Sequence, residues 1–213
     1  MQSTDPTLQR TERDGILLLT LNRPEARNAM NFELATALAA AMDELDARED
    51  LRLGIITGSE GTFCAGMDLK AFLKGSLPSI ANFGLPEVKR GLVAGAGGLV
   101  RLPRRLPFHV AMECALTGAM LSAQRAHAYG LVNRLTEPGQ ALATAQELGS
   151  AIAANGPLAI ATTKQVIMES ADWPTRDMFE LQRALTGPVF TSADAREGAV
   201  AFAEKRKPVW TGK

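Results

Sequence analysis

Two short segments of this 213-residue sequence have the composition to do chemistry at a carbonyl group. In the first, residues 57–69, a strand should pass through a tight turn into a short helix. Such a turn leaves backbone N–H groups unpaired at a helix N-terminus, and Gly66 lets another group approach closely. A carbonyl oxygen placed there would have the negative charge of its enolate stabilised by fixed dipoles. The N–H of Met67 is the expected donor, and an ordinary turn capped by Asp68 is the competing interpretation.

The second segment is built around Glu87, which follows Pro86 and precedes a glycine-rich bend at residues 95–98. A carboxylate held among the apolar neighbours of this segment is suited to move a proton at a carbon beside a carbonyl group. Glutamates are usually solvated, so a plain surface position is the alternative. The bend lacks the third glycine of a dinucleotide-binding fingerprint and the Gly-Lys-Ser/Thr ending of a P-loop, which argues against a nucleotide-binding loop.

The other reactive side chains have no partner at a useful spacing. Cys64 and Cys114 show neither a Cys-x-x-Cys spacing nor a nearby histidine, so both are expected to be small buried residues. His109 and His127 lack the serine, cysteine or aspartate arrangement of a catalytic triad. The sequence therefore predicts no metal site and no nucleophilic cysteine.

The composition argues against several classes of partner. Lys and Arg together number 23, as do Asp and Glu, so no overall positive field draws the chain to nucleic acid or to an anionic membrane. No apolar stretch is long enough to span a bilayer, and the first residues have neither the basic flank nor the apolar run of a targeting signal. We expect a cytoplasmic protein without nucleic-acid or membrane partners.

The order of elements along the chain predicts an α/β fold. Residues 16–21 and 53–58 are short apolar runs bounded by turn residues, and residues 32–45 carry apolar side chains at spacings of three and four. A strand, helix, strand order favours parallel pairing of the two strands, both of which are expected to be buried. Helical patterns follow near residues 107–117, 122–129, 139–154, 157–170 and 192–205.

Seven sequence segments carry a resemblance to a known family. They are residues 21–30 (LNRPEARNAM), 63–69 (FCAGMDL), 85–87 (LPE), 115–118 (ALTG), 126–133 (AHAYGLVN), 155–157 (NGP) and 201–206 (AFAEKR). Together, and in this order over nearly the whole chain, they resemble the crotonase superfamily, the enoyl-CoA hydratase/isomerase family.

The resemblance implies a fold, an assembly and a ligand. The expected fold is a spiral of β-β-α turns over residues 1–138, followed over residues 139–213 by helices that build homotrimers or dimers of trimers. The expected partner is an acyl-CoA thioester. No metal or redox cofactor is expected, because the coenzyme A is part of the substrate.

The resemblance also implies roles for individual residues. By analogy, the Met67 N–H is one donor of an oxyanion hole, and Glu87 is an acid/base glutamate. The substrate-binding residues implied are Ala26 on the loop that touches the nucleotide of coenzyme A, Ala65, Gly66, Asp68, Leu69 and Lys70 along the thioester, and Phe202 and Lys205 of the terminal helix. These roles imply a lyase of fatty-acid or related lipid metabolism, namely an enoyl-CoA hydratase.

One departure from the family keeps alternatives open. Only residues 70–84 lie between the first oxyanion segment and the Leu-Pro-Glu segment, where the family has several dozen more, so the chain is internally shortened near residues 76–82. In the family this stretch carries another strand, the second oxyanion donor and the other glutamate of hydratases. An enoyl-CoA isomerase and a non-catalytic acyl-CoA-binding or assembly subunit are therefore alternatives to a hydratase.

Overall fold

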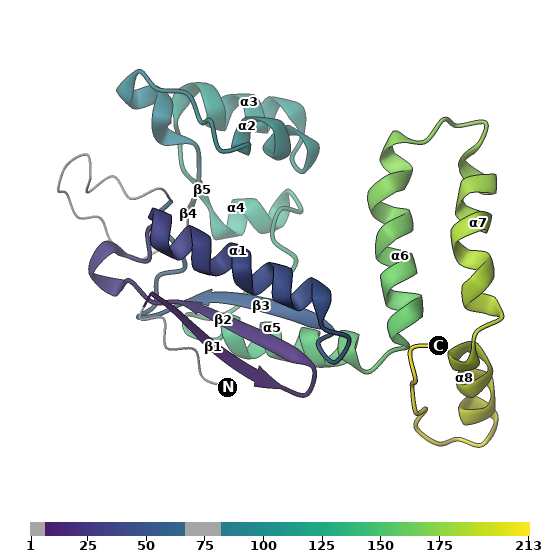
Figure 1. Cartoon of the computed structure of the whole chain (residues 1–213). Helices are drawn as coiled ribbons and strands as arrows, with labels where there is room; N and C mark the ends of the chain where they lie inside the picture. Colours follow the sequence, from purple (N-terminus) through teal and green to yellow (C-terminus); the bar gives the residue numbers. More distant parts are fainter. Residues whose placement is uncertain (1–6, 67–81) are drawn as a thin grey trace. The chain divides into compact units, whose positions relative to one another are not determined.

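The structure, a computed structural model, describes residues 7–66 and 82–213 (Figure 1). Its strands are β1 (Leu8–Arg13), β2 (Ile16–Leu21), β3 (Leu53–Gly58), β4 (Asn82–Phe83) and β5 (Leu121–Ser122). Its α-helices are α1 (Phe32–Ala47), α2 (Gly98–Arg101), α3 (Phe108–Thr117), α4 (Ala123–Ala128), α5 (Ala141–Ala153), α6 (Pro157–Glu169), α7 (Met178–Phe190) and α8 (Ala193–Ala203). Short 3-10 helices are η1 (Pro24–Ala26), η3 (Pro86–Arg90), η4 (Leu102–Arg104) and η5 (Ser170–Asp172).

The first three strands form one sheet in the order β1-β2-β3. Asp14 and Gly15 join β1 to β2 and both have positive φ angles, 52° and 75°, as a two-residue hairpin turn requires. The Arg52 N–H donates to the Gly15 carbonyl at 2.7 Å before both strands begin, and the Ser59 N–H donates to the Leu21 carbonyl at 2.9 Å where both end. The predicted parallel pairing of β2 with β3 is therefore confirmed.

Helices α1 and α5 lie against opposite faces of β3. A Cβ added to Gly54 would meet Leu45 of α1 at 3.0 Å, whereas Leu53 and Ile55 point toward Gly149 of α5. The side chains of a strand alternate between its two faces, so each helix covers one set. The prediction that both apolar strands are buried is wrong for part of β3, because Ile55 is buried but Ile56 keeps 38% of its surface exposed.

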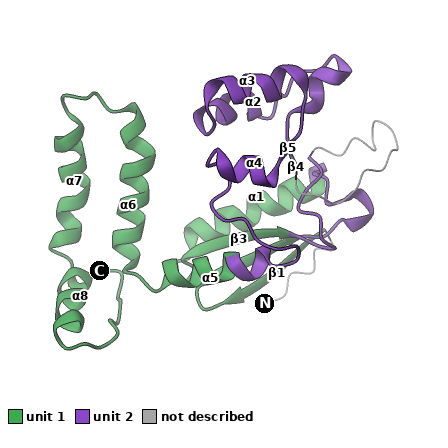
Figure 2. Ribbon diagram, turned by 180° about the vertical axis from the view of Figure 1, so that it is seen from behind, with its two compact units in different colours: residues 1–20, 33–57, 145–213 green, residues 21–32, 58–144 purple. Residues whose placement is uncertain are grey.

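The chain divides into two compact units (Figure 2). Unit 1 comprises residues 1–20, 33–57 and 145–213, and unit 2 comprises residues 21–32 and 58–144. Each unit combines segments that are far apart in the sequence, because the units are defined by contacts between residues. The predicted boundary between a core of residues 1–138 and a helical region of residues 139–213 therefore stays a prediction. Among the described residues, no helix has the length and apolar character needed to cross a membrane.

The core of unit 2 lies around helices α3 and α4. Its buried residues are Leu106, Val110, Ala111, Cys114, Leu121 and Ala126. The prediction of a buried Cys114 is confirmed. Strand β5 pairs with β4 in antiparallel register, with Asn82 opposite Ser122 and Phe83 opposite Leu121. This pairing ties the start of the Glu87 segment to the core.

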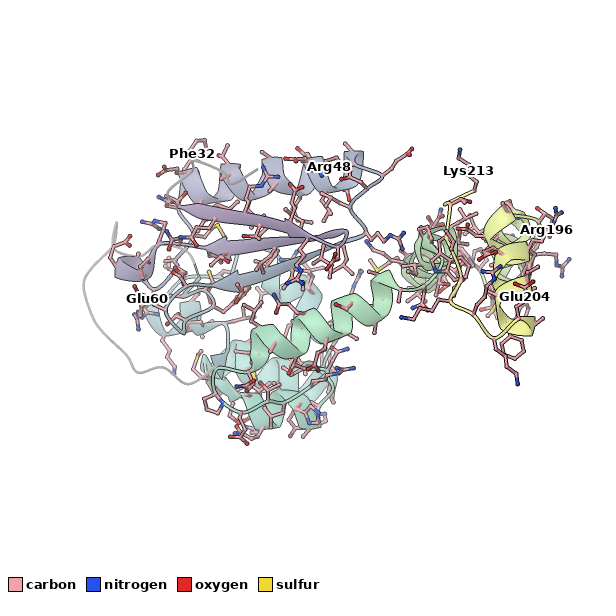
Figure 3. The ribbon with its side chains drawn as sticks, turned by 90° about the horizontal axis from the view of Figure 1, so that it is seen from below. Phe32, Arg48, Glu60, Arg196, Glu204 and Lys213 are labelled. Atoms are coloured by element: carbon pink, nitrogen blue, oxygen red, sulfur yellow. The ribbon has the colours of Figure 1, made fainter. Side chains whose placement is uncertain are left out.

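Ion pairs join β1 to α1 in unit 1. The guanidinium of Arg48, which is labelled in Figure 3, donates to both carboxylate oxygens of Glu12 at 2.8 Å and to Glu44 at 3.0 Å. Arg10 donates to the same Glu44 at 2.5 Å. These hydrogen bonds lower the pKa of Glu12 and of Glu44. Ion pairs this close to solvent contribute little to stability, about 0–1 kcal/mol for each pair.

Two carboxylates hold the C-terminal residues against α8. Asp194 accepts hydrogen bonds from the Thr211 N–H at 2.7 Å, the Thr211 hydroxyl at 3.0 Å and the Gly212 N–H at 3.0 Å. Glu197 accepts two bonds from Arg206 and one from the Val209 N–H, which lower its pKa to about 2. Figure 3 shows Lys213 at the end of this segment. The C-terminal tail is thus part of the packing of unit 1.

The buried Asp194 predicts a pH dependence of stability. Burial alone would raise the pKa of its carboxyl, but the hydrogen bonds from Thr211 and Gly212 outweigh burial and hold the pKa below its ordinary value. A lowered folded-state pKa stabilises the fold above the unfolded value of about 4, and this stability is lost as the pH falls through the folded pKa. Thermal unfolding of Asp194→Asn should therefore start several degrees lower at pH 7 and change less between pH 7 and pH 3 than that of the wild type. Equal pH slopes for the two proteins would contradict this prediction.

Candidate active site

Two loops of unit 2 run side by side where the sequence predicts the thioester site. The Ala65 N–H donates to the Arg27 carbonyl at 3.1 Å, and the Met30 N–H donates to the Gly66 carbonyl at 2.7 Å. Ala65 and Gly66 are exposed, whereas the predicted contact residue Ala26 has only 8% of its surface exposed. The predicted contact of Ala26 with the nucleotide of coenzyme A stays a prediction, and little of this residue is accessible for it.

Gly58 at the end of β3 allows the following loop to fold back. A Cβ at this position would collide with the carbonyl oxygens of Thr62 and Phe63. Only glycine leaves room for such a close approach of backbone. The sharp turn expected after the strand is present, and it needs glycine at residue 58 as well as at Gly66, whose φ is 90°.

The Gly66 N–H is already occupied by Cys64. The Cys64 sulfur accepts from this N–H at 3.4 Å, and the residue is half-buried rather than buried as predicted. The reason is local: the thiol turns back to the backbone of its own loop and does not enter the core. The Gly66 N–H is therefore already engaged and is a poor candidate for an oxyanion donor. Met67, Asp68, Leu69 and Lys70, named by the sequence for this part of the site, lie outside the described residues.

The Glu87 segment is fixed by close contacts on both sides. A Cβ at Gly84 would lie 2.6 Å from the Met120 sulfur and 3.2 Å from the Ala119 carbonyl oxygen. A Cβ at Gly98 would lie 2.6 Å from a methyl carbon of Leu85. Leu85 itself lines an apolar pocket of about 60 Å³ together with Leu99, Leu102, Pro103, Ala111, Met112 and Ala115. These contacts set the position at which η3 begins.

Glu87 is half-buried, and one of its carboxylate oxygens is out of contact with water. This oxygen, Oε2, has no hydrogen-bond partner within the described part of the chain. A buried polar atom without a partner is costly and calls for an explanation, such as a bound water or ion, strain or a catalytic role. The partial burial of Glu87 is compatible with the expected acid/base group, and both that role and its apolar surroundings stay predictions.

The two predicted contact residues of the terminal helix lie in unit 1. Phe202 keeps 87% of its surface exposed near the end of α8. Lys205 is exposed and has a left-handed φ of 54°, and the Arg206 N–H closes the helix by donating to the Ala201 carbonyl at 3.0 Å. Left-handed backbone is uncommon outside glycine and costs energy, so this helix end is a strained position. Both side chains are available for contact with a ligand or another molecule.

Comparison with known proteins decides the family. A family model described as enoyl-CoA hydratase/isomerase matches residues 11–82 and 77–213. The chain belongs to the enoyl-CoA hydratase/isomerase family. This confirms the predicted crotonase membership, the α/β fold class and the assignment to a hydratase-type lyase.

Relatives of this family match almost end to end. Enoyl-CoA hydratase EchA19 of Mycobacterium tuberculosis is 36% identical over 243 residues, which covers 90% of this chain and 91% of the relative. A carnitinyl-CoA dehydratase of Salmonella typhi is 31% identical over 259 residues, which covers 97% of this chain and 99% of the relative. The crystal structure of an enoyl-CoA hydratase from M. tuberculosis H37Rv has a TM-score of 0.91 and 46% identity, covering 98% of this chain and 100% of that one.

The comparisons also locate the internal shortening. The two matched pieces of the family model, residues 11–82 and 77–213, overlap at residues 77–82. The alignment with the Salmonella dehydratase extends over 259 residues, but 97% of 213 residues is only about 207, so about 52 aligned positions have no residue of this chain. The shortening expected near residues 76–82 agrees with the place where the matched pieces meet.

The Gly84 contact leads to a prediction about the placement of Glu87. Gly84→Ala should force Met120 and the Ala119 backbone apart from β4, which costs about 1–3 kcal/mol of stability by overpacking. Because Glu87 follows three residues later, kcat/KM for an enoyl-CoA should fall about tenfold. The matched control is Gly95→Ala, since a Cβ at Gly95 would meet no atom within 4 Å. Similar effects of the two changes on kcat/KM, measured by a steady-state assay, would contradict the prediction.

Proposed function

We propose that this chain binds a 2-enoyl-CoA thioester and catalyses the addition of water to its double bond. The observation that carries the proposal is the buried Oε2 of Glu87, which has no hydrogen-bond partner among residues 7–66 and 82–213. It lies in the same unit as the loop at residues 58–66 that leads to the predicted oxyanion donor. Family membership supplies the class of reaction, and this carboxylate supplies a group that can move the proton.

The proposed reaction balances with one carboxylate and one water. The water oxygen bonds to C3 of the substrate while Glu87 accepts a water proton. The electron pair of the C2–C3 double bond moves toward the thioester oxygen, and the Met67 N–H stabilises the resulting enolate. Glu87 then returns its proton to C2. The product is a 3-hydroxyacyl-CoA, and the carboxylate is regenerated.

Further parts of the proposal concern assembly and setting. We propose a homotrimer or a dimer of trimers, in which the exposed Phe202 and Lys205 contact the coenzyme A bound by a neighbouring subunit. The setting proposed is fatty-acid or related lipid metabolism in the cytoplasm. The reaction needs no metal or redox cofactor, because the thioester substrate brings its own coenzyme A.

The internal shortening supports a second candidate. About 52 aligned positions of the Salmonella relative have no residue in this chain, and by the family resemblance that stretch carries the second oxyanion donor and the other glutamate of hydratases. A double-bond shift needs only one base to carry a proton between carbons, and Glu87 could do this alone. An enoyl-CoA isomerase is therefore the second candidate, and a non-catalytic acyl-CoA-binding subunit is the third.

One experiment separates the three candidates. The purified 213-residue chain, of confirmed intact mass, is incubated with crotonyl-CoA and the loss of enoyl-thioester absorbance is followed. Conversion of a 3-enoyl-CoA to the 2-enoyl isomer is assayed in parallel, and CoA binding is measured by calorimetry. Hydration is the expected result. Isomerisation alone favours the isomerase, and binding without either reaction favours the binding subunit.

A further inference from the structure

Asn28 joins the two loops of the candidate site through a fully buried side chain. It lies between η1 and α1 in unit 2 and has 0% of its surface exposed. Its φ is 55°, in the left-handed region, and the preceding Arg27 has a φ of 52°. Asparagine tolerates this conformation better than most residues, because its short amide can bond to nearby backbone.

Every hydrogen-bonding position of the Asn28 amide is in use. Its Nδ2 donates to the carbonyl oxygens of Ser59 at 2.9 Å and Thr62 at 2.6 Å. Its Oδ1 accepts from the Arg23 N–H at 2.8 Å and from the Ser59 hydroxyl at 3.2 Å. An asparagine side chain offers two donor hydrogens and two acceptor lone pairs, so all four are paired.

The Asn28 amide bonds to both loops. The acceptor oxygen holds residue 23 of the first loop, and the donor nitrogen holds residues 59 and 62 of the second. Beyond Thr62 the second loop reaches Ala65 and Gly66, which bond to Arg27 and Met30 on either side of Asn28. Gly66 directly precedes Met67 in the sequence. The two Nδ2 bonds therefore fix the base of the second loop, whose far end at Ala65 and Gly66 bonds back to the first loop.

We infer that Asn28 is a positioning residue for the thioester site. Its amide sets the distance between the loop at residues 23–30 and the loop at residues 58–66, and so holds the exposed backbone of Ala65 and Gly66 beside the first loop. The inference rests on the proposed function for its catalytic consequence. Its structural consequence, the order of the second loop, does not depend on any reaction.

Aspartate is the most informative replacement for Asn28. Asn28→Asp keeps the shape and the tolerance of left-handed backbone, but it places a second acceptor oxygen against the carbonyls of Ser59 and Thr62. Asn28→Gly retains the tolerance of left-handed backbone and removes all four side-chain hydrogen bonds. It replaces Asn28→Asp in the test if the aspartate variant does not fold. The matched control is Leu34→Ala, which opens the core at a fully buried position in α1 of unit 1.

The test measures loop order and turnover separately, at a temperature where every variant is fully folded. In the ligand-free protein, amide hydrogen exchange at Ala65 and Met30 should be at least tenfold faster in the Asn28 variants than in the wild type, and unchanged in Leu34→Ala. In turnover of crotonyl-CoA, kcat should fall at least tenfold for the Asn28 variants and stay within twofold for Leu34→Ala.

The two readouts distinguish failure of the inference from failure of the proposed function. The inference is overturned if the rate of amide hydrogen exchange at Ala65 and Met30 in the Asn28 variants equals that of the wild type. It is also overturned if Leu34→Ala accelerates this exchange as much as the Asn28 variants do. A wild type that binds CoA but does not turn over crotonyl-CoA overturns only the proposed function, because the exchange experiment still decides the role of Asn28.

Discussion

Glu87→Gln should lower kcat for hydration of crotonyl-CoA by about 10²–10⁴-fold, the usual contribution of a positioned acid or base. Glutamine has the same shape but cannot carry the proton between water and C2. Stability should change little or rise slightly, because the change removes a carboxylate whose Oε2 is buried without a partner among the described residues. Steady-state kinetics and thermal unfolding of the same preparation test both parts.

The matched control for this change is Glu113→Gln. Glu113 is an exposed glutamate of α3 in the same unit, so its neutralisation alters the net charge equally without touching the candidate site. It should retain at least half of the wild-type kcat. Undiminished turnover in Glu87→Gln would exclude Glu87 as the acid/base group and leave the hydratase without its proton carrier.

Restoring the internal segment should produce the second large effect. The stretch of about 52 positions that the relative has in excess would be inserted at residues 77–82. By the family resemblance it carries the second oxyanion donor, and one such donor is worth about 3 kcal/mol, or on the order of 100-fold in kcat. We therefore expect kcat for crotonyl-CoA to rise at least 100-fold over that of the 213-residue chain.

A glycine and serine linker of equal length at the same position is the control for chain length alone. It should leave kcat unchanged, because a flexible loop adds neither a strand nor a fixed donor. No gain from the family segment, in a protein that folds and binds CoA, would mean that the short chain already builds a complete site. The proposed reaction would then depend on groups that the family analogy does not name.

Local pattern alone was enough to place many elements. The apolar runs at residues 16–21 and 53–58 coincide with β2 and β3, and the spacing of three and four after Asn31 predicts α1. Helices α6 and α8 also lie where the sequence indicates them. These elements each carry a repeated apolar pattern, which reports secondary structure without knowledge of distant contacts.

Other elements depend on contacts that the sequence does not display. Strand β1 was not predicted, because Arg10, Glu12 and Arg13 leave it without an apolar pattern and its pairing with β2 defines it. Helix α7 was missed because Pro188 lies inside it, and proline ordinarily ends a helix. Strands β4 and β5 have two residues each, so only their mutual pairing defines them.

For the candidate site, the sequence by itself determined the family, the order of its motifs and the place of the shortening, and it singled out Glu87 as the predicted acid/base residue. Only the tertiary structure decided that one oxygen of Glu87 is buried without a described partner, that Cys64 occupies the Gly66 N–H, and that Asn28 joins two loops. The physical reason is sequence distance. Asn28 lies more than 30 residues from Ser59 and Thr62, so nothing in either local pattern reports that their hydrogen-bonding groups meet.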